Sequence, residues 1–356
     1  MSNVLKIAAF VHQPPQYNRR SGMAPLAEAL GAHTVYYEDR WHQLQRYSWR
    51  IGALMSNCAK IWYGSGWNYL LPMVDELKLA WDVPQCDIAH FLFGEFASPR
   101  HPQWFRRKAK ALVGTFHASA RRLPSVLGRF KGCSNFDAIT LMSESQRAFF
   151  CEKGVPEDRL AVILHGVDTK YFVPDPMRPE MPDGPLRGLL VGSTERDHAM
   201  MAEVLRVLPK GILEMTILTA YDQRVLNYAD VPHAVFPEHL SDVELLKAYQ
   251  QSDILIMPMQ DCTANNAVLE SMACGTPVMV NRVGGIPEYV DPGCNDVIET
   301  HTVDAWVDRL LYWHAHRVKL AALRPGVRKW AEQFDWSLVA PRYFDVYKRV
   351  LSQDQS

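Results

Sequence analysis

The sequence lacks the features that would mark a membrane-spanning or disulfide-stabilised protein. It has no run of about 18 consecutive apolar residues, so it predicts no membrane-spanning helix. The apolar stretch near the N-terminus is too short for a signal peptide and is not followed by a small-residue cleavage site. Seven cysteines lie scattered among 356 residues without a Cys-x-x-Cys spacing. This pattern argues against structural zinc and favours buried free thiols, so we expect a cytoplasmic protein.

The sequence also has little net charge, −1 overall, but its two halves differ. Residues 1–172 hold 21 Lys or Arg against 14 Asp or Glu, a balance of +7, so the remainder carries −8. Six of the ten tryptophans lie in this basic half, which favours peripheral contact with the anionic inner face of a membrane. An ordinary core with solvated charges explains the composition equally well. Because the positive charges are spread out and no recognition motif accompanies them, we expect no nucleic-acid partner.

Short apolar runs alternate with helical or loop sequence, which is typical of a parallel α/β sheet. In the first half these runs are residues 4–11, 88–93, 111–116 and 138–142. A proline-rich segment, residues 173–185, then interrupts regular structure and is the strongest domain boundary in the sequence. A second series of apolar runs begins at residues 188–191. The sequence therefore predicts two Rossmann-like α/β domains, at residues 1–178 and 185–336.

Residues 254–290 contain the clearest candidate for a ligand site. They are predicted to form a buried strand, a polar loop, a helix, a tight turn, a second strand and a glycine loop. A helix that begins directly after a parallel strand offers N–H groups and a positive dipole end, which favour a phosphate. Glu270 lies one turn inside this helix, on the same face as Asn266, where its carboxylate could accept two ribose hydroxyls. The pattern indicates a nucleotide site, with Thr263, Asn265 or Asn266 as the helix cap.

Polar residues also occur at the predicted strands of the first half. Glu95, His117 and Ser143 come just after three of these strands, and open α/β sheets bind ligands at the carboxyl ends of their strands. His90 lies inside a strand and is expected to pack within the sheet. Gly22 follows the first strand and precedes a helix, although a single glycine is usually only a turn. No Asp-x-Asp motif follows an apolar strand.

The sequence as a whole resembles the family-4 glycosyltransferases, which have the GT-B fold. Its most specific motifs are LSDVELLKAYQQSDILIMPM and LESMACGTPVMVNRVGGIPEYV. Others, in the family's order, are SGMAPLAEAL, DIAHFLFG, LVGTFHAS and DAITLMSESQRAFFCEKGVPEDRLAVILHGVDTKYF. The resemblance implies two Rossmann-like domains facing across a cleft, the first binding the acceptor and the second the nucleotide sugar. It also implies that a final helix, at about residues 337–356, crosses back to complete the first domain.

The resemblance assigns roles to single residues of the second domain. Glu270 matches the second glutamate of the family's paired-glutamate motif, which binds the ribose. The position of the first glutamate, which touches the donor sugar, is Cys262 here, and Asn265 replaces a family glycine. A thiol is a weak hydrogen-bonding group and cannot replace a charged acceptor, although the adjacent Asp261 is a candidate substitute. The donor-binding residues expected in this region are Thr263, Asn265, Asn266, Ala267, Val268 and Glu270.

The resemblance also implies contacts from the loop that starts at Gly192 and from the first domain. In the family, an Arg and a Lys of this loop neutralise the leaving diphosphate. Here Ser193 stands at the Arg position, and Arg196 is the cation near the Lys position. His117 matches a histidine near the donor sugar, and Gly22 matches a glycine where the backbone approaches the substrate. Gly22 and Gly192 are thus expected donor contacts, and the expected catalytic residues are His117, Arg196 and Glu270.

The implied function is metal-independent transfer of a sugar, with retention, from a UDP- or GDP-sugar to a glycan, lipid or small-molecule acceptor. No cofactor is expected besides this donor, and Lys170, Arg282 or Arg100 could compensate for Ser193. Two alternatives remain open. One is an inactive nucleotide-sugar binder or partner subunit, which Cys262 and Ser193 favour. The other is a nucleotide-sugar epimerase or hydrolase on the same fold, which the missing glutamate disfavours.

Overall fold

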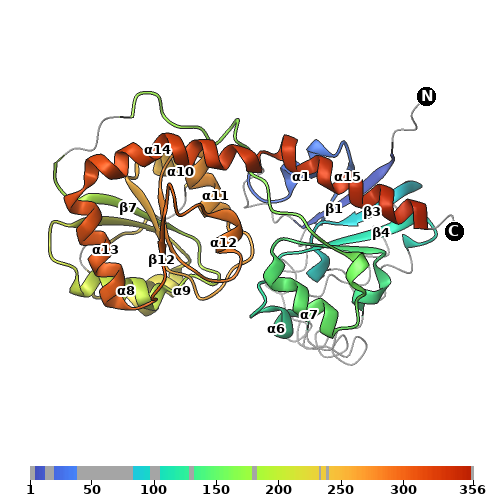
Figure 1. Ribbon diagram of the computed structural model, residues 1–356, viewed down its shortest axis with the longest axis horizontal. Helices are drawn as coiled ribbons and strands as arrows, with labels where there is room; N and C mark the ends of the chain where they lie inside the picture. The colour runs from blue at the N-terminus through green and yellow to red at the C-terminus, as the bar shows by residue number, and fades with distance from the viewer. Residues whose placement is uncertain are drawn as a thin grey trace, which may run out of the picture. The chain divides into compact units, whose positions relative to one another are not determined.

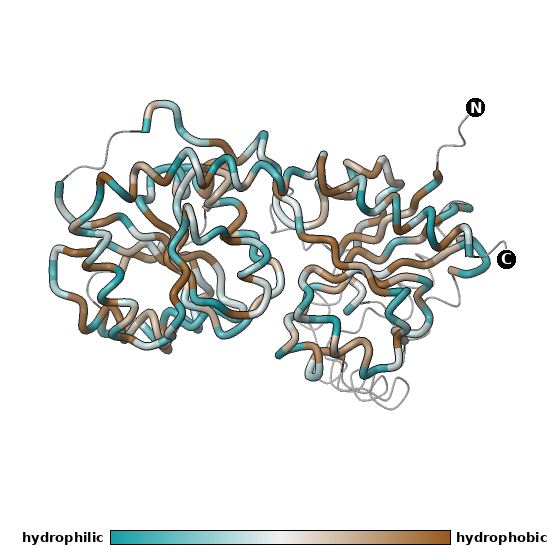
Figure 2. The backbone as a smooth tube through the Cα atoms, in the orientation of Figure 1, coloured by the Kyte–Doolittle hydropathy of each residue, from teal (hydrophilic) through white to brown (hydrophobic). Residues whose placement is uncertain are grey.

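The chain folds into two compact units. The computed structural model describes residues 5–12, 20–37, 83–96, 105–127, 132–178, 183–231, 234–237 and 240–353. The first unit is Met1–His165 with Trp336–Ser356, and the second is Gly166–Asp335. The described part of each unit forms a parallel six-stranded sheet with helices on both faces (Figure 1). Apolar residues concentrate along the strands of both sheets (Figure 2). The predicted α/β architecture is therefore confirmed.

The sheet of the first unit has the strand order β2-β1-β3-β4-β5-β6, and every neighbouring pair is parallel. Its central strands are buried on both faces, which is why they appear in the sequence as continuous apolar runs. Phe10, Phe91 and Phe105 pack ring against ring in the core. The strands are β1 (Ile7–His12), β2 (His33–Tyr37), β3 (Cys86–Phe91), β4 (Ala109–Phe116), β5 (Ala138–Leu141) and β6 (Leu160–Val162).

Helices cover both faces of this first sheet (Figure 1). Helices α1 (Ala24–Ala29) and α15 (Trp336–Gln353) lie on one face, and α6 (Leu123–Leu127) and α7 (Arg147–Glu152) lie on the other. Helix α15 buries Tyr343 and Tyr347 one turn apart, as an amphipathic helix does. Beneath it, the fully buried His90 of β3 lies 2.7 Å from the Tyr347 hydroxyl and 2.7 Å from Thr115 Oγ1. His90 therefore packs within the sheet, as expected, and joins α15 to it.

The sheet of the second unit has the strand order β12-β11-β10-β7-β8-β9, again all parallel. This is the dinucleotide-fold order, whose direction reverses between β7 and β10. The strands are β7 (Leu186–Val191), β8 (Leu213–Leu218), β9 (Ala234–Val235), β10 (Ile254–Met257), β11 (Val278–Asn281) and β12 (Asp296–Ile298). The helices are α8 (His198–Val207), α9 (Tyr221–Tyr228), α10 (Asp242–Gln251), α11 (Asn266–Ala273), α12 (Ile286–Tyr289), α13 (Val303–Ala315) and α14 (Arg317–Ala331). In the described ranges, no helix is long and apolar enough to cross a membrane.

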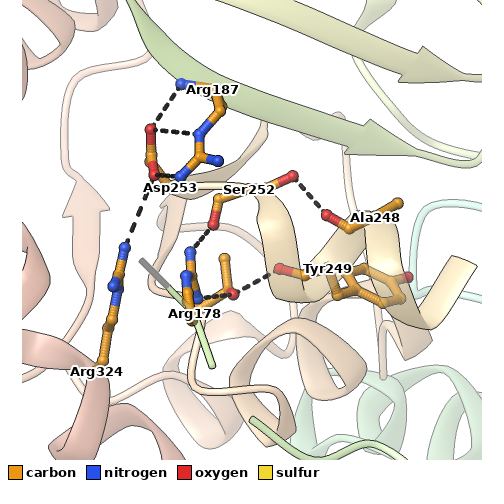
Figure 3. A network of polar contacts seen from close by, with 8 residues as sticks. Arg178, Arg187, Ala248, Tyr249, Ser252, Asp253 and Arg324 are labelled. Atoms are coloured by element: carbon orange, nitrogen blue, oxygen red, sulfur yellow. Dashed lines mark hydrogen bonds and ion pairs between the residues drawn. The ribbon is translucent and has the colours of Figure 1, made fainter. Parts of the chain in front are cut away.

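A cluster of arginines fixes the start of the second unit (Figure 3). Arg187, in β7, donates from Nε and Nη2 to the two oxygens of the buried Asp253, and Arg324 of α14 lies 3.7 Å from the same carboxylate. Arg178 donates to the Ser252 carbonyl at the end of α10, where a cation counters the negative end of the helix dipole. Residues 166–178 thus fold with the second unit. The units divide at residues 165–166, upstream of the proline-rich segment where the sequence placed the boundary.

Candidate functional site

Two loops meet at the carboxyl edge of the second sheet, where the strand order reverses. One follows β7 and the other follows β10, so they occupy the position at which sheets of this order bind ligands. The backbone N–H of Asp197 donates to the Pro258 carbonyl at 2.8 Å, and the N–H of Gln260 donates to the Glu195 carbonyl at 3.0 Å. These bonds tie the loops together. The resulting candidate donor site consists of Gly192, Arg196, Asn265 and Glu270.

Arg196 spans the two loops. It donates to the carbonyls of Val191 and Thr194, at 3.1 and 2.7 Å, and to Asn265 Oδ1 at 3.2 Å. All three acceptors are neutral, so these bonds leave the positive charge of the guanidinium uncompensated. Burial lowers the pKa of Arg196, and nearby acidic groups, Glu270 among them, offset part of that effect. The guanidinium is partly exposed, and its three hydrogen bonds include no ion pair, as suits a group that binds an anion.

Gly192 permits this position of the guanidinium. Its φ of +97° is in the left-handed region, and a Cβ there would lie 2.9 Å from the Arg196 Nη2 atom. The Gly192 carbonyl lies 3.1 Å from Nε2 of His198, whose Nδ1 lies 2.8 Å from the Tyr228 hydroxyl. Because a carbonyl only accepts, Nε2 carries the proton and Nδ1 accepts from Tyr228. The sequence reasoning did not single out His198, although it opens the helix that follows the Gly192 loop.

Asn265 caps helix α11. Its Oδ1 accepts from the Val268 N–H at 3.4 Å and from Arg196, so a single amide oxygen joins the helix start to the cation. Among the three candidate caps, Asn265 fills the role, while Thr263 is buried in the preceding loop and Asn266 is the first helical residue. The Val268 N–H, one of the expected diphosphate contacts, is therefore already bonded. Helix geometry leaves the N–H groups of Asn266 and Ala267 without an acceptor inside the helix.

Glu270 lies one turn inside α11 and is 4% exposed. The hydroxyl of Tyr249, on α10, donates to its Oε2 atom at 2.8 Å. Burial and the charge of Glu270 raise the pKa of Tyr249 well above its usual range, so the phenol stays protonated and donates. Glu270 thus lies on the helix whose cap, Asn265, is bonded to Arg196. Its role toward ribose stays a prediction.

Cys262 is buried beneath the glycine loop that follows β11. Burial raises its thiol pKa to about 12, so the sulfur stays uncharged, and Sγ lies 3.9 Å from the Val283 carbonyl. The Gly285 N–H donates to the Cys262 carbonyl at 2.9 Å. Gly284 has a φ of +51°, and a Cβ there would collide with the Cys262 carbonyl oxygen and with Asp261. The glycine pair therefore has a packing role at this loop.

Ser193, which stands where the resemblance implies an arginine, makes its hydrogen bonds within the second unit. Its Oγ lies 2.9 Å from Thr219 Oγ1 and accepts from the Ala220 N–H at 2.9 Å. These contacts join the loop after β7 to the segment after β8. Among the described residues, no group of three or more His, Cys, Asp or Glu side chains is placed to hold a metal ion.

The first unit has its own polar group at the carboxyl ends of β3 and β4. Glu95 accepts from the backbone N–H of His117 and, at 2.6 Å, from that of Ala118, and its second oxygen lies 3.6 Å from His117 Nδ1. The His117 ring stacks on Phe93 with centroids 4.4 Å apart. Burial alone would raise the pKa of Glu95, but the contacts with His117 outweigh it and hold the pKa below its usual value. Gly22 has a φ of +71° just before α1 and belongs to the same unit.

Known proteins share sequence features with this chain. Residues 188–316 match the family model described as Glycosyl transferases group 1. The chain is 33% identical over 225 residues to a D-inositol 3-phosphate glycosyltransferase of Thermobispora bispora, over 56% of this chain and 52% of that protein. It is 28% identical over 236 residues to an MMP alpha-(1->4)-mannosyltransferase of Mycolicibacterium hassiacum, over 61% and 55% of the two chains. The aligned part thus spans about half the length of these relatives.

Solved structures share the fold of the whole chain. Sucrose-phosphate synthase from Thermosynechococcus elongatus aligns with a TM-score of 0.70 at 15% identity, over 98% of this chain and 100% of that one. The catalytic domain of starch synthase IV from Arabidopsis thaliana aligns with a TM-score of 0.68 at 14% identity, over 98% and 99% of the two chains. These matches support the predicted GT-B fold. Residues 188–316, which lie in the second unit, are thus similar to the group 1 glycosyl transferases.

Proposed function

We propose that the protein transfers a sugar from a nucleoside-diphosphate sugar to a hydroxyl group of an acceptor. The observation that carries this proposal is the position of Arg196, which Asn265 joins to the start of α11 at the reversal point of the sheet. A partly buried cation and a helix N-terminus together stabilise the charge that develops on a departing diphosphate. Glu270, one turn further along α11, is the proposed partner of the ribose.

The relatives support the class of reaction. By their names, one is a glycosyltransferase of D-inositol 3-phosphate and another is a mannosyltransferase. For this chain we propose a UDP- or GDP-sugar as donor and a glycan, a lipid or a small polar molecule as acceptor. Retention would follow if the departing diphosphate, held by Arg196, takes the acceptor proton on the face it leaves. His117 in the first unit is the proposed contact of the donor sugar.

The test is to incubate the purified protein with a panel of UDP- and GDP-sugars, with and without lipid, glycan and polyol-phosphate acceptors. The expected result is release of UDP or GDP that depends on an acceptor, with a new glycoside visible by mass spectrometry. Release of nucleotide without an acceptor would indicate a hydrolase. A change in the donor sugar's configuration, seen by proton NMR, would indicate an epimerase. Either result would overturn the proposal.

A specific observation also favours a second function, binding of a nucleotide sugar without catalysis. Cys262 is a neutral, buried thiol, and Ser193 is bonded within the protein, so two positions expected to hold charged groups hold none. Calorimetry separates the two functions. Tight binding of a nucleotide sugar without turnover against the whole acceptor panel would support the binding function.

We propose further that the first unit associates with anionic membrane surfaces. Support comes from the charge of +7 over residues 1–172 and from the six tryptophans of this half. The test is co-sedimentation with vesicles of neutral lipid alone and of neutral lipid mixed with phosphatidylglycerol. Binding only to the anionic vesicles, reduced by salt, is the expected result. Equal recovery with both vesicle types would refute the association.

A further inference from the structure

Tyr249 is held at both of its ends. Its backbone carbonyl accepts from Thr276 Oγ1 at 2.7 Å, and Thr276 Oγ1 in turn accepts from Arg178 Nη1 at 2.9 Å (Figure 3). Its hydroxyl donates to Glu270 Oε2 at 2.8 Å. The ring is fully buried and meets Phe172 edge to face, with centroids 6.1 Å apart. A side chain fixed along its whole length has one orientation in which to hold its partner.

Tyr249 also stands apart within its own helix. Among the residues of α10 it is the buried one, and the helix begins with a capping box formed by Ser241 and Glu244. The helix is therefore stabilised at its start by local bonds, and this ring is its buried contact with the rest of the unit. A phenylalanine ring would preserve that attachment. The hydroxyl is thus a polar group that packing alone does not require.

The carboxylate of Glu270 gains a defined orientation from this hydroxyl. A carboxylate has two oxygens that accept hydrogen bonds, and the bond from Tyr249 takes a site on Oε2. This bond and the backbone of α11 together fix the directions in which the other lone pairs of the Glu270 carboxylate point. A vicinal diol, such as the 2′ and 3′ hydroxyls of a ribose, presents two donors in a fixed geometry, which suits an acceptor whose orientation is fixed.

We propose that Tyr249 is a positioning residue that sets Glu270 to recognise the ribose diol, and so makes the donor site selective for ribonucleotides over 2′-deoxyribonucleotides. This inference rests on the proposed function, because it takes Glu270 to be the ribose partner. It goes further by assigning a residue on a different helix, and a substrate discrimination, to the same site. Loss of one hydrogen bond between a ribose hydroxyl and the charged carboxylate should weaken nucleotide binding about tenfold.

The experiment measures binding by calorimetry with the full chain. The probes are UDP and 2′-deoxy-UDP, or GDP and 2′-deoxy-GDP, whichever pair the unaltered protein binds. The unaltered protein is expected to bind the ribonucleotide about tenfold more tightly. In Tyr249→Phe, ribonucleotide binding should weaken about fivefold to tenfold while deoxyribonucleotide binding changes less. The ratio of the two dissociation constants, deoxyribonucleotide over ribonucleotide, should therefore approach one. A ratio that stays within twofold of the original would overturn the inference.

Two further variants separate a positioning role from a general loss of structure. Tyr347→Phe removes the hydroxyl of an equally buried tyrosine, bonded to His90 in the first unit, and should leave the ratio unchanged. In a Glu270→Gln background, Tyr249→Phe should have no further effect on the ratio, because both changes act through one carboxylate. Independent, additive effects of the two substitutions would overturn the inference.

A third variant keeps the test decisive if Tyr249→Phe does not fold. Thr276→Val removes the bond to the Tyr249 carbonyl and leaves the phenol in place, and it should shift the ratio in the same direction by about twofold. An unchanged ratio in a folded Thr276→Val protein would then overturn the proposal that Tyr249 positions Glu270. Failure of the proposed function gives a different result, because the unaltered protein would bind no nucleoside diphosphate. That outcome would overturn the inference together with the proposed function.

Discussion

The two units have similar sheets but very different carboxyl edges. In the second unit the edge is built around a cation, Arg196, whose three hydrogen bonds go to neutral oxygens. In the first unit the edge is built around an anion, Glu95, which accepts from two backbone N–H groups and lies beside the His117 ring. The same topology therefore supports opposite charges, because the residues after each strand set the chemistry of the edge and the sheet only positions them.

The difference also shows how each charge is kept in place. Arg196 is held by loops that bond to each other across β7 and β10, so its position depends on loop–loop contacts. Glu95 is held by a single chain segment, since both N–H donors belong to the residues directly after β4. The second edge thus holds a positive charge and the first a negative one. This difference agrees with the proposal that the diphosphate binds at the second edge.

The largest expected effect comes from removing the cation. Arg196→Gln should lower kcat of the proposed transfer by up to about 1,000-fold, or about 4 kcal/mol, because the departing diphosphate loses its charged partner. Steady-state kinetics with the best donor and acceptor would measure this loss. Arg206→Gln is the matched control, since Arg206 is an exposed arginine of the same unit paired with Asp230 and should leave kcat unchanged. Similar losses of kcat in both variants would show that Arg196 has no role beyond that of a surface arginine.

A smaller but still large effect should follow from Gly284→Ala. The new Cβ would collide with the Cys262 carbonyl, and the φ of +51° adds strain, so the unfolding free energy should fall by about 3 kcal/mol. Gly154→Ala, in the first unit, has a φ of +81° but nothing within 4 Å of the new Cβ, so it should cost about 1 kcal/mol. Urea unfolding of both variants measures the difference. Equal losses would show that crowding at the second edge is unimportant.

At the edge of the first unit, Glu95→Gln should lower kcat and the unfolding free energy by smaller amounts. An amide accepts from the backbone with one oxygen and carries no charge, so kcat should fall about tenfold, and the unfolding free energy by about 1.5 kcal/mol at pH 7. Because the folded pKa of Glu95 lies below its usual 4.5, its contribution is present above about pH 4.5 and lost as pH falls through the folded value. The stability difference between the two proteins should therefore narrow below pH 4.5. A constant difference in urea unfolding from pH 7 to pH 3.5 would contradict this account.

At pH 7 the smallest expected effect concerns the buried His90 beneath α15, because its contribution appears only as pH falls below 6.5. Burial lowers its pKa from 6.5 to about 3, so the unfolded chain binds a proton that the folded chain excludes between those values. Stability of the first unit should then fall as pH drops from 6.5, by up to about 1.4 kcal/mol per pH unit. His90→Asn removes this titration, so its unfolding free energy should depend less on pH over that range. The same slope in both proteins would indicate that another group titrates.

The sequence predicted the fold better than it predicted the contacts of the candidate site. The apolar run at residues 254–257 and the helix that begins at Asn266 follow from local composition, so they could be placed in advance. The choice of Asn265 as the cap could be narrowed to three residues because short polar side chains fill that role. Its second bond, to Arg196, joins residues 69 apart and depends on how two loops pair. Local patterns hold no information about such pairing.

Other contacts depend on tertiary packing alone. Tyr249 reaches Glu270 because α10 and α11 lie side by side, and its hydrophobic spacing in the sequence shows only that it is buried. His90 meets Tyr347 across 257 residues. The assignment of residues 166–178 to the second unit likewise depends on tertiary contacts. Prolines predict where regular structure stops, whereas bonds such as those of Arg178 and Arg328 attach the segment to the second unit.

The position of α15 has a consequence for how the protein is made. The first unit contains residues 1–165, but the helix that buries Tyr343 and Tyr347 against it is residues 336–353. During synthesis, the ribosome must finish the entire second unit before the first can receive this helix. Until then, His90 and the sheet face around it lack their cover. The second unit, a continuous segment of chain, can complete its fold earlier, so the order of folding should run against the order of translation.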